Sequence, residues 1–124
     1  QQNFFHDNLQ FIHAEAITYL RENTHRFEVL ILSHILEHLD SPVVLLKDFK
    51  IFFSFFYIEV PDFERTPLNH YRHELNSTLI YSDSDHIWEF DRIEITNIIN
   101  EAGLEILDRE YRQGVQKYWC KVAN

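Results

Sequence analysis

The stretch FEVLILSHILEHLDSP, residues 27–42, decides the fold. Residues 27–33 are almost all apolar, which is typical of a strand buried on both faces of a parallel sheet. A helix start follows at Asp40, Ser41 and Pro42, because proline is favoured at the first helical position directly after an N-cap residue. A buried strand that leads at once into a helix predicts an α/β domain.

The neighbouring residues continue this alternation of strand and helix. Residues 9–13 read as a short strand and residues 15–22 as a helix. The helix that begins at Pro42 is expected to end near Lys50, and residues 55–60 form a second apolar strand before Pro61. We therefore predict a largely parallel sheet within one domain that comprises residues 1–124.

The C-terminal third predicts a helix followed by an antiparallel hairpin. Asp91 and Glu94 have the spacing of a capping box, and Gly103 is placed to end the helix. Residues 104–111 and 115–122 then alternate apolar and polar side chains around a short turn, as the strands of a hairpin do.

A long polar segment, residues 61–90, separates the second strand from this helix. It has no clear period, apart from one expected helical turn near residues 71–75. Loops of this length in a compact domain are usually functional, so we expect residues of the segment to contact a substrate.

Composition excludes several classes of function. The chain has 124 residues, a formal net charge of −9 and only 2 glycines, so it contains no glycine-rich phosphate loop. Nucleic acids and anionic membranes are poor partners for such an acidic chain. The single cysteine, Cys120, cannot form an internal disulfide, which favours a reducing compartment such as the cytoplasm.

Three stretches, taken in order, resemble class I S-adenosylmethionine-dependent methyltransferases. Residues 27–39 resemble the fourth strand of that fold and its exit, and YIEVPD, residues 57–62, resembles the fifth strand. HIWEF, residues 86–90, with the capped helix and the final hairpin, resembles the end of the domain. The resemblance implies the C-terminal part of a three-layer Rossmann-like methyltransferase fold, which is incomplete here.

The resemblance also implies where S-adenosylmethionine would bind in a complete domain. Glu15, followed by Ala16, matches the acidic position that hydrogen-bonds the adenine amino group. Ser33 and His34 match positions that line the methionine end of the cofactor and the entrance for the substrate. The alternative for Glu15 is a solvated acid in the first turn of a helix, where the helix dipole favours it.

The family's glycine-rich first strand and its second strand have no counterpart in these residues. In the family both strands lie between the third and the fourth, so strand 27–33 is expected either to have an open edge or to pair directly with residues 9–13. We expect the chain alone not to bind the cofactor tightly. Because it starts at Gln1 and lacks methionine, we also expect it to be a fragment or a processed chain. An open edge at residues 27–33 favours self-association or a partner chain.

His86, Tyr71 and Asp62 are the candidate catalytic residues. Histidine is suited to removing a proton near neutral pH, and all three lie in or next to the long segment. The alternative is that the histidines are ordinary exposed loop residues. The sequence does not rank the three.

The string HILEH, residues 34–38, also matches the H-x-x-E-H pattern of zinc peptidases. That pattern needs a helix long enough to place His34 and His38 on one face, and here the string lies between a strand and a helix start. No third ligand is evident, so we predict no metal site. The preferred function is methyl transfer to a small-molecule acceptor, and the alternative is a truncated methyltransferase-like subunit with a scaffold role.

Overall fold

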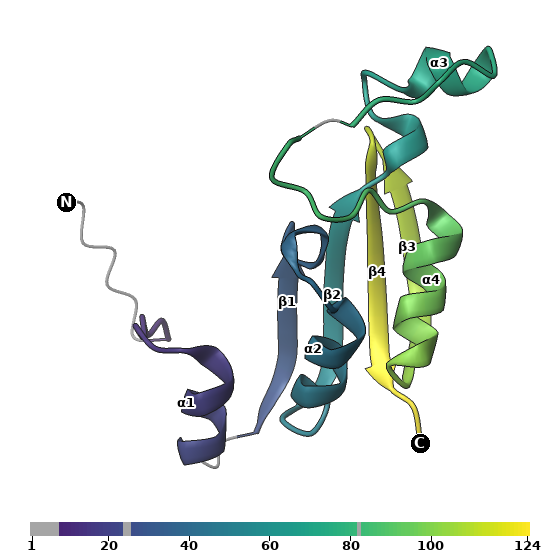
Figure 1. Ribbon diagram of the computed structural model, residues 1–124. Coiled ribbons are helices and arrows are strands. Elements are labelled where there is room, and N and C mark those ends of the chain that lie inside the picture. The colour runs from purple at the N-terminus through teal and green to yellow at the C-terminus, as the bar shows by residue number, and fades with distance from the viewer. Residues whose placement is uncertain (1–7, 24–25, 82) are drawn as a thin grey trace.

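The computed structural model describes residues 8–23, 26–81 and 83–124 (Figure 1). Its main elements are, in chain order, α1 (Ala16–Asn23), β1 (Phe27–Ser33), α2 (Pro42–Phe49), β2 (Phe53–Pro61), α3 (His70–Glu74), α4 (Arg92–Glu101), β3 (Leu104–Arg112) and β4 (Val115–Val122). Two single turns of 3-10 helix, η1 (Leu36–His38) and η2 (Phe63–Arg65), follow β1 and β2.

The four strands form one sheet in the order β1-β2-β4-β3. β1 and β2 are parallel, with Leu30 opposite Phe56 and Ser33 opposite Glu59. β4 is antiparallel to both β2 and β3. The expected parallel neighbours and the expected C-terminal hairpin are both confirmed. The parallel part of this sheet consists of one strand pair, because β3 and β4 are the strands of the hairpin.

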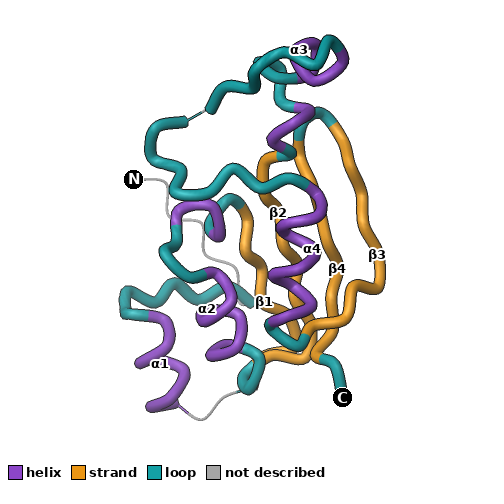
Figure 2. The backbone as a smooth tube through the Cα atoms, turned by 45° about the vertical axis from the view of Figure 1, so that its right-hand side comes forward, coloured by secondary structure: helices purple, strands orange, loops and turns teal. Residues whose placement is uncertain are grey.

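Helices α2 and α4 cover one face of the sheet, and the core lies between them and the strands (Figure 2). Strand β2 alternates strictly, so that Phe56, Ile58 and Val60 are fully buried. Full burial of such a side chain stabilises the fold by about 1.5–3 kcal/mol. The other fully buried members of this core include Leu46, Ile95, Ile99, Tyr118 and Cys120.

Cys120 belongs to this core as a small apolar side chain. Burial raises the pKa of its thiol to about 12. A thiol with such a pKa is protonated at neutral pH, so Cys120 is no nucleophile.

The opposite face of the sheet carries no helix within the described ranges. On β1, Ile31 is 64% exposed and Val29 is 36% exposed. Further along this face, Phe55 stacks on Trp119 with ring centroids 5.3 Å apart. The described residues therefore form two of the three layers that the resemblance predicts.

The predicted strand at residues 9–13 is wrong. These residues are not in a strand, and their side chains are exposed. A strand needs a neighbour for its N–H and C=O groups, and none of the described strands lies beside this segment. Among the described strands, β1 therefore forms an edge of the sheet. This agrees with the expectation of an open edge at residues 27–33, and not with the expectation that they pair with residues 9–13.

The helix start, the helix end and the hairpin turn of the C-terminal third are as predicted. The Asp91 carboxylate accepts hydrogen bonds from the backbone N–H groups of Ile93 and Glu94, and the Glu94 carboxylate accepts one from the N–H of Asp91. Gly103, with φ +83°, ends α4 in the left-handed conformation. Gln113 and Gly114 both have positive φ, which is the requirement of a two-residue type I′ hairpin turn.

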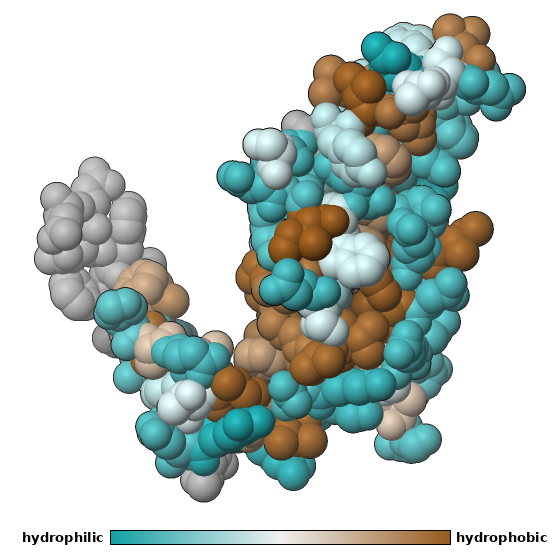
Figure 3. All heavy atoms as spheres, viewed as in Figure 1, coloured by the Kyte–Doolittle hydropathy of each residue, from teal (hydrophilic) through white to brown (hydrophobic). Residues whose placement is uncertain are grey.

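Apolar side chains also reach the surface on the helical side, where Figure 3 shows them gathered over the region of α2 and α4. Helix α1 packs beside β1, and Leu20 is its buried residue. None of the helices in the described ranges has the length and apolar character needed to cross a bilayer.

Candidate functional site at the carboxyl ends of β1 and β2

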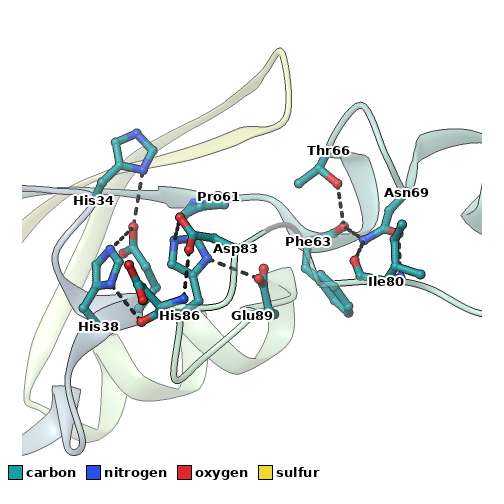
Figure 4. Close-up of polar contacts among 12 residues, drawn as sticks. His34, His38, Pro61, Phe63, Thr66, Asn69, Ile80, Asp83, His86 and Glu89 are labelled. Carbon is teal, nitrogen blue, oxygen red and sulfur yellow. Dashed lines mark hydrogen bonds and ion pairs between the residues drawn. The ribbon is translucent and has the colours of Figure 1, made fainter.

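The carboxyl ends of β1 and β2 lie side by side, because the strands are parallel and Ser33 is opposite Glu59. In open α/β sheets ligands bind at this end of the strands. The turn after β1 and residues 83–90 of the long segment meet here, and together they gather histidines and carboxylates (Figure 4).

Three side chains converge on the carboxylate of Glu59. The hydroxyl of Tyr57 donates to Oε2 over 2.8 Å and the hydroxyl of Ser33 donates to Oε1 over 3.1 Å. Nε2 of His34 lies 3.0 Å from Oε1. The hydrogen bond from Tyr57, followed by the smaller contributions of Ser33 and His34, holds the pKa of Glu59 below its usual value. Ser33 and His34 thus both contact Glu59 at the carboxyl end of β1.

Glu37 differs from Glu59 in having no such donors. It is 1% exposed, and neither of its carboxylate oxygens has a hydrogen-bond partner. Oε1 lies 3.4 Å from Nδ1 of His34 and 4.0 Å from Nε2 of His38, which are ion-pair distances without the geometry of a hydrogen bond. A buried charged group that lacks hydrogen bonds costs more than about 1–3 kcal/mol. This carboxylate is the most unusual polar group of the site.

His38 and His86 lie next to Glu37 and next to each other. Their rings meet edge to face with centroids 4.8 Å apart. Nδ1 of His38 lies 3.1 Å from the backbone oxygen of Asp85, and Nδ1 of His86 lies 3.2 Å from Oε1 of Glu89 (Figure 4). Because a carbonyl and a carboxylate only accept, we assign the proton of each neutral ring to Nδ1, which leaves Nε2 as the acceptor nitrogen.

The backbone of the long segment fixes this arrangement. The N–H groups of Ile87 and Trp88 both donate to the carbonyl of Glu37, over 2.9 and 3.0 Å. The indole N–H of Trp88 donates to the carbonyl of Leu39 over 2.8 Å. His86 is therefore held against the turn after β1, although the two are far apart in the sequence.

Glu37, His38 and His86 form a group that could hold a metal ion, since one ligand atom from each lies within 4.8 Å of the others. This group shares Glu37 and His38 with the H-x-x-E-H pattern, but its third member is His86 instead of His34. Residues Leu36–His38 form a single 3-10 turn, and His34 has φ +52°, so the helix required by the zinc-peptidase hypothesis does not form. The sequence pattern indicated Glu37 and His38, but it did not indicate that His86 lies next to them.

Asp62, at the exit of β2, is a buried carboxylate in an ion pair with the partly exposed side chain of Arg92. Nε and Nη2 of Arg92 both donate to its Oδ2, over 3.0 and 2.9 Å. The guanidinium in turn lies 3.7 Å from the ring centroid of Tyr111, and the N–H of Asp62 donates to the carbonyl of Gly114 over 2.8 Å. Asp62 thereby fastens the end of β2 to α4 and to the hairpin. Sequence reasoning missed Arg92, because it reads only as the first residue of a helix.

Tyr71 lies away from the other two candidate catalytic residues, on α3 beyond the end of the sheet (Figure 1). It is 75% exposed, and its ring meets the edge of the His70 ring. The loop around α3 is organised by the buried side chain of Asn69, whose amide donates to the carbonyl of Ile80 and accepts from its N–H. The structure thus places Asp62, Tyr71 and His86 in three separate environments.

Glu15 caps α1. Its carboxylate accepts hydrogen bonds from the N–H groups of Ile17, over 3.3 Å, and Thr18, over 2.8 Å. Hydrogen bonding to Thr18 lowers the pKa of Glu15. Ala16 is the first residue of α1 and lines an apolar pocket of about 210 Å³ between α1 and the sheet, together with Tyr19 and Leu30. Glu15 and Ala16 are therefore on a different element from Ser33 and His34.

No protein-family model and no curated protein sequence matches the chain. Solved structures are nevertheless similar to it. The mitomycin 7-O-methyltransferase MmcR superposes over 82% of this chain with a TM-score of 0.58 at 14% identity. The small RNA methyltransferase HEN1 superposes over 81% with a TM-score of 0.60 at 12% identity. An S-adenosylmethionine-dependent methyltransferase from Clostridium acetobutylicum superposes over 90% with a TM-score of 0.59 at 12% identity.

These similarities establish the fold. Most of the chain has the Rossmann-like fold of methyltransferases, as the resemblance in its sequence implied. The chain spans 32% of the length of MmcR, 14% of HEN1 and 64% of the clostridial enzyme. It therefore corresponds to a part of each of these proteins.

Proposed function

We propose that this chain is part of an S-adenosylmethionine-dependent methyltransferase that acts on a small-molecule acceptor. The strand order β1-β2-β4-β3 carries the proposal, since one parallel pair is continued by a hairpin whose last strand lies inside the sheet. The methyltransferases with similar structures support it. In such a reaction the protein aligns the acceptor with the sulfonium methyl group and removes water from both reactants.

S-adenosylmethionine is the proposed cofactor of the complete domain. Ser33 and His34 are assigned to its methionine end, because they lie together at the carboxyl end of β1. The proposed adenine contact of Glu15 competes with the hydrogen bonds that this carboxylate makes within α1. A cofactor that binds Glu15 would have to share or replace those bonds.

A small-molecule acceptor is favoured over a nucleic acid by charge. The chain has 20 acidic residues against 11 lysines and arginines, and binding a phosphate backbone requires a basic surface. Among the three candidate catalytic residues, His86 is the one that lies next to the turn after β1, against His38. Asp62 is occupied by Arg92, and Tyr71 lies on α3.

A second candidate function is a methyltransferase-like subunit with a scaffold role. The observation that favours it is the edge position of β1, where Ile31 and Val29 are exposed and no described strand lies on the outer side. Such an edge can bind a partner chain, or a second copy of this one, by strand addition.

Titration calorimetry with S-adenosylhomocysteine separates the two candidates. We expect no binding by the 124-residue chain alone and about micromolar binding by the product of the complete gene. His34→Ala should weaken that binding by about tenfold, whereas the surface substitution Leu68→Ala should leave it unchanged. If the complete gene product is folded but binds no S-adenosylhomocysteine, the methyltransferase proposal is contradicted. The scaffold role is then the remaining candidate function.

A further inference from the structure

We propose that Glu37, His38 and His86 form a binding site for one divalent transition-metal ion, with Zn²⁺ as the representative ion. The first observation is the carboxylate of Glu37. It is 1% exposed and has no hydrogen bond from any described residue, and it lies between the rings of His34 and His38. Buried polar groups are normally paired, so a buried carboxylate without hydrogen bonds indicates a missing cation.

The second observation is the orientation of both histidines. Nδ1 of His38 is bonded to the backbone oxygen of Asp85, and Nδ1 of His86 is bonded to the carboxylate of Glu89. Metal-binding histidines typically donate their other ring N–H to a carbonyl or a carboxylate, which fixes the ring and keeps the binding nitrogen unprotonated. His38 and His86 thus have one partner of each kind at Nδ1. Nε2 of His38 lies 4.0 Å from Glu37, and Nε2 of His86 lies 3.8 Å from the exposed carboxylate of Asp83, so neither Nε2 has a hydrogen bond that an ion would have to replace.

The distances fit an ion after a small adjustment. The three ligand atoms lie within 4.8 Å of one another. Zinc binds nitrogen and oxygen ligands at about 2.0–2.2 Å in tetrahedral geometry, so two ligands of one ion are about 3.4 Å apart. The longest separation must therefore shrink by up to about 1.4 Å. The side chain of His38 is 40% exposed and can turn, while the ring of His86 is held by the carboxylate of Glu89.

Charge also favours a cation at this position. Besides Glu37, the carboxylates of Asp83 and Glu89 lie 3.8 and 3.2 Å from nitrogens of His86. The carboxylate of Glu59 lies 3.0 Å from Nε2 of His34. Acidic groups thus surround the histidines, which makes the local potential negative.

The ligand types select the class of ion. Two imidazoles and one carboxylate suit Zn²⁺ and the neighbouring first-row ions, whereas Mg²⁺ and Ca²⁺ prefer oxygen ligands. Three protein ligands leave one or more coordination positions for a water or substrate oxygen, which can approach from the exposed side of His38. Metal binding at this site does not depend on the proposed methyl transfer, and His86 here is a ligand rather than a base.

Cobalt(II) reports on the site directly, because its visible absorption depends on the ligands. We expect one Co²⁺ per folded chain, with an absorption band that Zn²⁺ abolishes and Mg²⁺ does not. His38→Ala, His86→Ala and the nearly isosteric Glu37→Gln should each weaken binding by about 100-fold or more. Glu89→Gln, which keeps all three ligands, should weaken it by about 10–100-fold.

The matched control is the double variant His70→Ala, His73→Ala, which removes two histidines from α3 and should bind Co²⁺ as the unmodified chain does. Circular dichroism shows whether each variant is folded. The proposal is overturned if the folded chain binds no Co²⁺ below millimolar concentration, if Mg²⁺ displaces Co²⁺ at equal concentration, or if binding is lost with His70 and His73 but kept in the Glu37 variant.

Discussion

Two buried carboxylates lie at the carboxyl ends of the parallel strands, and their surroundings differ. Asp62 follows β2 and shares Oδ2 with two nitrogens of Arg92. Glu37 follows β1 and has no hydrogen bond to either oxygen. Both residues are 1% exposed. Burial alone therefore does not assign a role to a carboxylate. The partner of Asp62 is another part of the fold, whereas Glu37 is arranged for a partner that comes from outside.

Arg92→Met should have the largest effect on stability, because it leaves the buried Asp62 charge without its partner. We expect the free energy of unfolding, measured by urea denaturation, to fall by about 3 kcal/mol, at the low end of such losses because the Arg92 side chain is 40% exposed.

Two controls accompany that substitution. Arg112→Met removes a 70% exposed arginine from the surface and should cost less than about 0.5 kcal/mol. Adding Asp62→Asn to Arg92→Met should restore most of the loss, because the unpaired charge is then gone. If Arg92→Met lowers the free energy of unfolding no more than Arg112→Met does, the ion pair between Asp62 and Arg92 does not stabilise the fold.

Zn²⁺ should stabilise the unmodified chain by about 2.7 kcal/mol at a concentration 100-fold above its dissociation constant. Glu37→Gln should abolish this gain. Without metal the same substitution should leave the free energy of unfolding unchanged or raise it by about 1 kcal/mol, because it removes a buried carboxylate that has no hydrogen bond. Urea denaturation with Zn²⁺ and with a chelator measures both quantities. A large loss of stability in the chelator would mean that Glu37 already has a partner within the chain.

Gly114→Ala should cost about 1–2 kcal/mol. Gly114 has φ +75°, and an added Cβ would lie 3.1 Å from the carbonyl oxygen of Arg65. The substitution probes the hairpin tip that accepts the hydrogen bond from Asp62, so thermal unfolding should report it. Gln113→Gly at the adjacent position, φ +52°, should be neutral or slightly stabilising. Equal losses at the two positions would contradict this view of the turn.

The smallest expected effect concerns Glu59, a third carboxylate with several donors. Its lowered pKa gives stability that is present above its ordinary pKa of 4.5 and is lost as the pH falls through the folded-state value. Tyr57→Phe removes the hydrogen bond that lowers the pKa of Glu59 most, so it should raise this pKa toward 4.5. Ser33→Ala should raise the pKa less. Carboxyl carbon shifts in an NMR titration measure both changes, and no shift with Tyr57→Phe would contradict the assignment.

Elements with a local signal could be predicted from the sequence. Residues 27–33 and 55–60 are mostly apolar, and the capping box at Asp91 and the turn at Gly114 depend on neighbours only a few residues away. The predicted strand at residues 9–13 failed because a strand requires a partner strand, which no local pattern supplies.

The site was predicted in part for the same reason. Ser33 and His34 follow a strand, so the end of the sheet places them. The contact of His86 with Glu37 and the pairing of Asp62 with Arg92 join positions about 30–50 residues apart. These contacts depend on how residues 61–90 fold back onto the sheet. A segment without hydrophobic periodicity gives no basis for predicting its tertiary contacts from the sequence.

The most direct test of the contrast between the two carboxylates is anomalous X-ray diffraction from crystals of the chain grown with Zn²⁺, recorded on both sides of the zinc absorption edge. We expect one strong anomalous peak between Glu37, His38 and His86, and no peak at Asp62. A peak at the histidines of α3 alone, or the absence of any peak beside Glu37, would contradict it.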